Sequence, residues 1–211
     1  MKRKIGKILI AFGLVLLLGA AGLLVFNELQ AAGAGRAAQE VLPELMIKIE
    51  QRQEAVEEGT LPTLDVLPGT PLEMLEPEDL EMTEVEIDGY GYIGYLSVPA
   101  LELELPIMGD WDYARLQIAP CRYSGSLLGE DLVLMAHNYD HHFGRLKNLS
   151  PGDTVIFMDM EGNVTRYQVV ALDILMPDAV EEMTAGIYDL ALFTCTYGGQ
   201  TRVTVYCDKL K

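Results

Sequence analysis

Residues 190–207 have the sequence LALFTCTYGGQTRVTVYC, which is two strand-like runs joined by a tight turn. Both runs are rich in β-branched, aromatic and other apolar residues, and Gly198-Gly199 between them is a turn signal. The pattern therefore predicts two neighbouring antiparallel strands. Cys195 ends the first strand and Arg202 opens the second, so the thiol and the guanidinium are expected to lie side by side.

Six further segments upstream have the same strand-like texture, and turn sequences such as Pro151-Gly152-Asp153 and Glu161-Gly162-Asn163 separate some of them. The complete set predicts strands at residues 90–98, 101–106, 115–118, 132–137, 154–159, 164–175, 190–195 and 201–207. Eight short strands with one or two helical turns between them predict a mainly β fold, a closed or nearly closed β-barrel over residues 89–211.

A third reactive side chain also stands at a strand end, because His137 closes the predicted strand 132–137. A cation beside Cys195 would favour its thiolate, and Arg202 could also stabilise an oxyanion. A histidine brought close would supply an acid and a base. A lone cysteine at a strand end is more often a small core residue, so spacing alone leaves a catalytic and a structural role about equally supported.

From about residue 91 to residue 210 the chain resembles the sortases, membrane-anchored cysteine transpeptidases of Gram-positive bacteria. The resemblance rests on Ala136-His137-Asn138, on Ala191-Leu192-Phe193-Thr194-Cys195 and on Arg202 in the last strand. Supporting segments lie at residues 119–120, 123–126 and 143–153. Two positions depart from the family pattern, since Ala136 replaces the usual glycine and Ala191 replaces a threonine. The resemblance implies an eight-stranded sortase-type barrel with short helices and leaves the subclass open.

The resemblance also implies roles for particular residues. Cys195 would attack the threonine carbonyl of a Leu-Pro-x-Thr-Gly-like sorting signal, and His137 would protonate the leaving amine and deprotonate the incoming one. Arg202 would hold the oxyanion or the substrate backbone. Thr194 and Asn138 would support the oxyanion and the substrate. The segment 176–189 leads into the nucleophile strand and would form one wall of the peptide groove.

The implied partners are secreted proteins with a C-terminal sorting signal and an amine acceptor, either a peptidoglycan cross-bridge or a pilin lysine. The implied chemistry, that of a thiol protease extended to amine acceptors, needs no cofactor and no metal. Some sortases bind Ca²⁺ through acidic loops, but no spaced set of oxygen ligands is visible in this sequence.

The N-terminus predicts a membrane anchor. Residues 1–7 contain four basic residues and precede an uncharged apolar run at 8–26, whose nineteen residues would span about 28 Å as a helix, close to the ~30 Å hydrocarbon core. The positive-inside bias places residues 1–7 in the cytoplasm, the helix among the membrane lipids and the catalytic domain outside the cell membrane. A cleaved signal peptide is the alternative, because residues 31–35 are small.

Two segments separate the apolar run from the barrel. Residues 27–58 predict a helical stalk, with Val41, Leu45 and Ile49 at helical spacing and an interruption at Pro43. Residues 59–88 predict an extended acidic, proline-rich linker. Within it, Leu67-Pro68-Gly69-Thr70-Pro71 imitates a sorting signal and could act as an autoinhibitory pseudosubstrate, although a chance coincidence is the simpler interpretation.

The charge distribution argues against a nucleic-acid ligand. The formal net charge is −17, residues 40–88 carry fifteen acids against two bases, and no basic stripe follows residue 7. Three cysteines leave at least one unpaired outside the cell. Cys121 and Cys207 could form a disulfide, but two separate buried thiols fit the sequence better.

Three other functions stay open. The HNYDHH segment at residues 137–142 suggests a metal site, but a zinc-protease motif needs Glu where Asn138 stands; the simpler interpretation is a polar loop with two exposed histidines. A papain-like protease would place its cysteine before its histidine, the reverse of this order. An inactive, membrane-tethered peptide-binding module on the same barrel is the third.

Overall fold

A computed structural model of the chain describes residues 2–58 and 81–210, so most of the predicted linker, with its sorting-signal-like stretch at 67–71, lies outside the described residues. The helices and strands in chain order are α1 (Lys2–Glu57), β1 (Val85–Ile87), β2 (Tyr90–Val98), η3 (Pro99–Leu101), β3 (Leu103–Met108), η4 (Arg115–Gln117), β4 (Cys121–Ser124), β5 (Leu132–Ala136), η5 (Phe143–Asn148), β6 (Thr154–Asp159), β7 (Val164–Leu175), α2 (Val180–Met183), β8 (Leu190–Cys195) and β9 (Arg202–Lys209).

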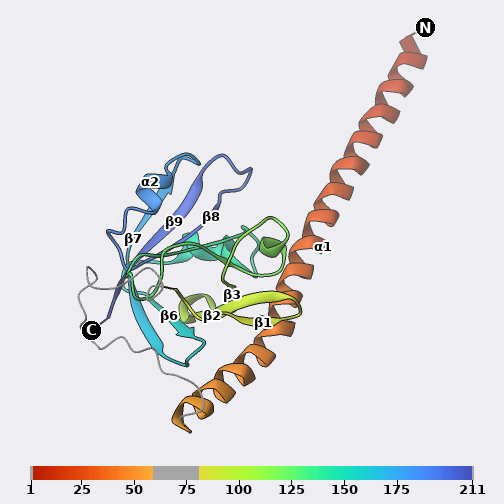
Figure 1. Ribbon diagram of the computed structural model, residues 1–211. Coiled ribbons are helices and arrows are strands. Elements are labelled where there is room, and N and C mark those ends of the chain that lie inside the picture. Colours follow the sequence, from red (N-terminus) through yellow and green to blue (C-terminus); the bar gives the residue numbers. More distant parts are fainter. Residues whose placement is uncertain (1, 59–80, 211) are drawn as a thin grey trace.

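The strands of the described chain form one sheet that closes on itself. Their order is β1-β2-β3-β4-β5-β8-β9-β7-β6, and a further antiparallel pairing joins β6 to β2, where Leu96 lies opposite Phe157. Strand β1 pairs only with the beginning of β2, so the ring itself has eight strands (Figure 1). The eight-stranded barrel predicted from the sequence is confirmed.

Seven of the predicted strands are present, with ends that move by at most two residues. The strand predicted at 115–118 is wrong, because this segment forms the helical turn η4. The carboxylate of Asp112 accepts a bond of 2.7 Å from the Arg115 backbone N–H and one of 2.9 Å from its guanidinium, and such a local bond competes with strand pairing. The eighth ring strand is instead β4, which has only four residues.

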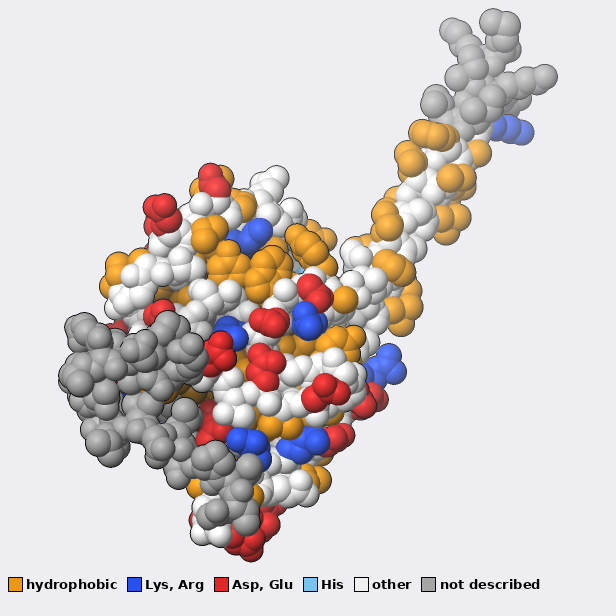
Figure 2. All heavy atoms as spheres, in the orientation of Figure 1, with side chains coloured by type: hydrophobic (Ala, Val, Ile, Leu, Met, Phe, Trp, Pro, Cys, Tyr) orange, Lys and Arg blue, Asp and Glu red, His pale blue; other side chains and the backbone are white. Residues whose placement is uncertain are grey.

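Helix α1 is continuous from Lys2 to Glu57 and does not break at Pro43, contrary to the sequence-based prediction. Pro43 is exposed, so the carbonyl that its ring leaves unpaired can bond to water. Among the described helices, α1 is long and apolar enough to cross a membrane. Its projecting N-terminal part is covered with apolar side chains (Figure 2), and Ile10 and Leu18 are 67% and 73% exposed.

The C-terminal half of α1 lies along the barrel. Val41, Leu45 and Ile49, the predicted apolar face, are buried against a cluster that includes Tyr92 and Met108. Polar contacts add to this packing: the Gln39 side chain donates to the Glu104 carbonyl at 3.1 Å, and Arg52 pairs with Glu161 at 3.1 Å. Helix α1 is therefore both a projecting apolar segment and a structural part of the barrel domain.

Besides the cluster under α1, two further apolar clusters belong to the barrel. The interior is filled by large side chains from most strands, among them Ile93, Leu96, Leu105, Ile107, Leu132, Leu134, Phe157, Leu192 and Val205. A second cluster covers the outer face of β5, β8 and β9 and consists of Val133, Met183, Ala191, Phe193 and Tyr206. Met183 comes from α2, so the segment between β7 and β8 folds over this outer face.

Candidate active site

The three predicted catalytic residues meet at one end of three adjacent strands. Strands β5 and β8 run parallel, and their last pair is Ala136 opposite Thr194, so His137 and Cys195 are the next residues on neighbouring strands about 4.8 Å apart. Strands β8 and β9 are antiparallel, and Cys195 lies directly opposite Arg202. The predicted cross-strand pair of thiol and guanidinium is therefore present.

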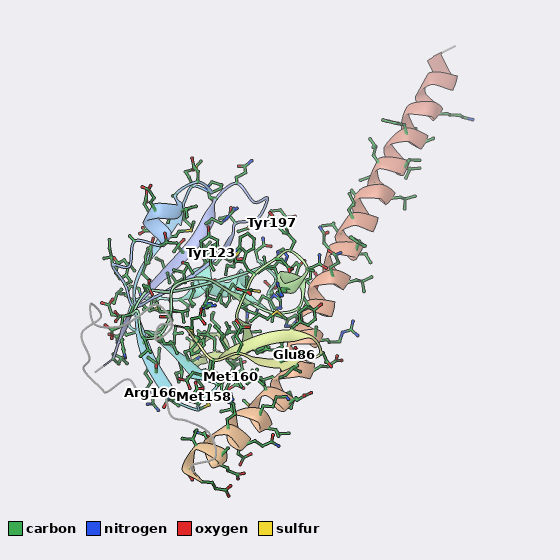
Figure 3. The ribbon with its side chains drawn as sticks, in the orientation of Figure 1. Glu86, Tyr123, Met158, Met160, Arg166 and Tyr197 are labelled. Atoms are coloured by element: carbon green, nitrogen blue, oxygen red, sulfur yellow. The ribbon has the colours of Figure 1, made fainter. Side chains whose placement is uncertain are left out.

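Strand alternation places this site on the outer face of the barrel. Phe193 belongs to the outer apolar cluster, and Cys195, two residues further along β8, points to the same side. Arg202 shares that side because it pairs with Cys195. Tyr197, in the turn just after Cys195, marks the site end of the barrel in Figure 3, while Arg166 and Met158 mark the opposite end.

Cys195 is the accessible cysteine of the chain. All three cysteines are free thiols, and Cys195 is partly exposed whereas Cys121 and Cys207 are buried. Burial raises the pKa of the Cys121 thiol and of the Cys207 thiol to about 12. These two thiols lie in separate apolar clusters, which leaves Cys195 as the group suited to nucleophilic attack.

His137 is half-buried at the end of β5. Burial lowers the pKa of its imidazole below the ordinary value, so the neutral form, which can accept a proton, predominates at neutral pH. The ring packs against that of Tyr139 with 4.9 Å between centroids. The His137 carbonyl accepts a hydrogen bond of 3.2 Å from the Phe143 N–H, so both the ring and the backbone of this residue are held.

Arg202 is held by the turn that precedes it. Its Nη1 donates to the carbonyls of Gly199 and Thr201, each at 3.1 Å. Gly198 and Gly199 have φ angles of +87° and +73°, a conformation that glycine adopts without strain. Within the described residues no bond engages Nη2 or Nε, so these donors remain available to an oxygen near Cys195.

The two predicted supporting residues tie the strands together. Thr194 is buried, and its hydroxyl donates to the Ala136 carbonyl at 2.8 Å. The Asn138 side-chain amide donates to the Thr196 carbonyl at 3.5 Å. These bonds connect the histidine end of β5 to the cysteine end of β8, while a direct role of Thr194 or Asn138 toward an oxyanion stays a prediction.

The segment between β7 and β8 borders the outer face that leads to Cys195. Met183 is buried against the outer apolar cluster, and the Tyr206 hydroxyl approaches the Glu182 carbonyl at 3.5 Å. Met176 and Ile187 in the same segment are 60% and 76% exposed. The segment therefore packs beside the nucleophile strand, and its role as one wall of a peptide groove stays a prediction.

On the other side, aromatic rings extend from the nucleophile strand. Phe193 meets Tyr123 edge-on at 5.2 Å, and Tyr123 lies against Trp111 at 5.8 Å. Trp111 is partly exposed beside an open pocket of about 450 Å³ lined by Gly109, Asp110, Trp111, Arg115, Arg122, Tyr123, Ser124 and Gly125. The tryptophan therefore packs on neighbouring aromatic rings.

The loop after His137 differs from the expected pair of exposed histidines. His141 is exposed, but His142 is fully buried, and neither ring nitrogen has a hydrogen-bond partner among the described residues. Burial lowers the pKa of His142 to about 4. No group of three or more His, Cys, Asp or Glu in the described part of the chain is arranged to hold a metal ion.

The buried His142 predicts a pH-dependent stability. The unfolded chain binds a proton at this residue from about pH 6.5 downward, whereas the folded chain resists protonation until about pH 4. Stability contributed by the neutral ring should therefore be lost as the pH falls through this window. We expect urea unfolding at pH 4.5 to show a larger loss, relative to pH 7, for the natural chain than for His142→Phe. Parallel pH profiles of the two proteins would contradict this.

Comparison with known proteins agrees with this architecture. The family model described as "Sortase domain" matches residues 96–210, more than half of the chain. No curated protein matches the chain. SortaseC1 from Streptococcus suis is 26% identical over 57% of this chain and 73% of its own, with a TM-score of 0.52.

Two further solved structures share the fold over most of this chain. Sortase C from Streptococcus pneumoniae is 22% identical, covers 83% of this chain and 97% of its own, and has a TM-score of 0.54. Clostridium perfringens sortase C with the C-terminal cell wall sorting motif is 22% identical. It covers 82% of this chain and 90% of its own, with a TM-score of 0.51. At these identities the likeness concerns the fold.

Proposed function

The chain belongs to the sortase family of cysteine transpeptidases, and on that premise we propose that it cleaves a Leu-Pro-x-Thr-Gly-like sorting signal after threonine and joins the product to an amine. The observation that carries the proposal is the pairing of Cys195 with Arg202, beside the strand end that presents His137. A nucleophile, an oxyanion donor and an acid–base group are then within reach of one peptide bond.

The first half of the reaction forms a thioester. As the Cys195 sulfur attacks the threonine carbonyl carbon, the thiol proton passes to His137, whose lowered pKa keeps it neutral and able to accept the proton. The free donors of Arg202 face the negative oxygen that develops. The C–N bond to the next residue then breaks, and His137 gives its proton to the leaving amine.

The second half forms an amide. An incoming primary amine attacks the thioester, His137 takes the proton that the amine loses, and the carbon–sulfur bond breaks. The sulfur of Cys195 recovers a proton from His137, which restores the starting state. The proton that left with the first amine is thus replaced by one from the incoming amine, both passing through His137, and the proposed reaction uses no metal and no cofactor.

Substrates and location follow from the same proposal. The similar structures include a Clostridium perfringens sortase C with the C-terminal cell wall sorting motif and a Streptococcus pneumoniae sortase C that is informative on pilin substrate specificity, which supports secreted proteins with sorting signals as donors. The acceptor would be a peptidoglycan cross-bridge amine or a pilin lysine. The basic residues before the apolar segment support an orientation with the barrel on the outer side of the membrane.

Helix α1 would hold the site close to that membrane. Ala34 is the first buried residue among the described side chains of the helix, and it follows the end of the apolar run at Phe26 by eight residues, or about 12 Å of helix. In Figure 1 the turns that follow β7 and β8 lie on the side of the barrel toward the projecting half of α1. The site would thus meet substrates whose cleavage point lies near the bilayer.

The proposal is tested with the full chain in detergent. We expect a mass increase at Cys195 equal to the acylating fragment when Leu-Pro-x-Thr-Gly or Asn-Pro-x-Thr-x peptides are added, and an amide product when a primary amine follows. Iodoacetamide at pH 8 should modify Cys195 alone, since Cys121 and Cys207 are buried with raised pKa values, and should abolish both products. Peptide binding without any acylation would instead indicate an inactive binding module.

A further inference from the structure

Helix α1 comes very close to the loop that follows His137 at Gly35. A Cβ atom added at Gly35 would lie 2.7 Å from the His141 Cβ and 2.8 Å from its Cγ, closer than side chains pack in proteins. Gly33, one half-turn earlier, has nothing within 4 Å of such an atom. The missing side chain of Gly35 is therefore what lets the histidine loop approach the helix backbone.

The next residue of the loop is buried in the same contact. His142 is 0% exposed, and the backbone carbonyls of Ala34 in α1 and Ile118 after η4 face its ring without reaching hydrogen-bonding geometry. A neutral imidazole without hydrogen bonds acts through van der Waals packing rather than through polar contacts. His142 is thus a packing wedge between the membrane-proximal helix and the loop.

Contacts continue from this wedge to the candidate acid–base residue. The His142 ring lies 5.7 Å from the Tyr139 ring, and the Tyr139 ring lies 4.9 Å from the His137 ring. The loop backbone is closed as well, because the N–H groups of His142 and Gly144 each donate to the Tyr139 carbonyl at 2.9 Å. A displacement of the loop at α1 would therefore be transmitted to His137.

We propose that Gly35 and His142 are positioning residues, through which the docked helix α1 sets the orientation of His137 at the active site. The anchor helix would then contribute to turnover as well as to location. The assignment rests on the proposed function in one respect, that His137 acts on substrate; the contacts themselves do not depend on it. The position of a catalytic side chain matters, because a displacement of about 1 Å can lower the reaction rate by about 10²-fold.

A pair of matched variants tests this. Gly35→Leu and Gly33→Leu replace a glycine in the same helix and gain similar helix propensity, but only the first meets the histidine loop. We expect Gly35→Leu to lower kcat by about 10-fold or more, with KM for the sorting peptide within about twofold. Gly33→Leu should match the natural chain. Equal kcat values for the two variants would overturn the proposal.

A second measurement does not require activity. The chain has three histidines, so their ring signals in the full chain can be assigned by single substitutions and titrated by NMR. Burial lowers the pKa of His137, and the nearby imidazoles of His137 and His141 add to the lowering of the pKa of His142. In Gly35→Leu we expect the pKa of His137 to rise toward its ordinary value, and in Gly33→Leu to stay unchanged.

The last variants test whether an aromatic ring is needed at position 142. His142→Phe keeps an aromatic wedge and should retain kcat within about threefold, whereas His142→Ala leaves a cavity and should behave like Gly35→Leu. If the natural chain transfers no acyl group, the proposed function fails, yet the NMR titration still decides the positioning role. An unchanged His137 titration in both Gly35→Leu and His142→Ala would refute it.

Discussion

Cys195→Ala should abolish thioester formation and transpeptidation while the fold stays intact. The substitution removes the only thiol of the chain that is both partly exposed and opposite a guanidinium. Cys121 and Cys207 cannot replace it, because they are buried and their pKa values are raised to about 12. Since the reaction passes through a bond to sulfur, the expected loss is complete within detection, on the scale of at least about 10³-fold.

The measurement is mass spectrometry of the acylated chain together with the rate of amide product. Cys195→Ser is the matched control for shape, because it puts an oxygen atom where the sulfur was. We expect this variant to be acylated only at a trace rate. Thermal unfolding of both variants should agree with the natural chain, since Cys195 lies at a strand end outside the buried core. A tenth of the natural turnover in Cys195→Ala would remove this residue from the nucleophile role.

The part of this site that depends on local sequence was predictable. Cys195 and Arg202 face each other because one short turn with two glycines fixes the register of β8 and β9, and such a hairpin is visible in the sequence. The barrel was predictable for the same reason, because apolar alternation and turn residues mark seven of its eight ring strands. Strand β4 was missed because four residues are too few to show a period.

The proximity of His137 to Cys195, unlike that of Cys195 to Arg202, could not be predicted from the local sequence. It depends on the parallel pairing of β5 with β8, in which the paired residues Ala136 and Thr194 are 58 positions apart. No short-range pattern specifies such a pairing, so it was predicted from the family resemblance alone. The geometry places both residues at the same end of the barrel, but their chemical roles stay predictions until variants are measured.

The docking of α1 on the histidine loop could not be predicted. Val41, Leu45 and Ile49 indicated an apolar face, but not which surface it covers, because any apolar surface could accept it. The contact at Gly35 depends on an absent side chain, and His142 looks like any polar loop residue in the sequence. Tertiary packing alone distinguishes the buried His142 from the exposed His141 beside it.

His137→Ala and Arg202→Ala should each lower kcat/KM by at least about 10²-fold, the cost of removing a general acid–base group or an oxyanion donor. The reason for His137 is its place at the end of β5 beside the nucleophile strand. The reason for Arg202 is that it pairs with Cys195 across β8 and β9, while the Gly199 and Thr201 carbonyls engage only its Nη1.

Arg202→Lys separates charge from geometry. Lysine keeps the positive charge, but it lacks the planar fork that binds the turn carbonyls and an oxyanion at once, so we expect it to recover less than about a tenth of the natural rate. Arg166→Ala is the control, since this exposed arginine lies at the opposite end of the barrel (Figure 3) and should not change the rate. Full activity in Arg202→Lys would show that a nearby positive charge suffices and that the fixed guanidinium of the β8–β9 hairpin is not the oxyanion donor.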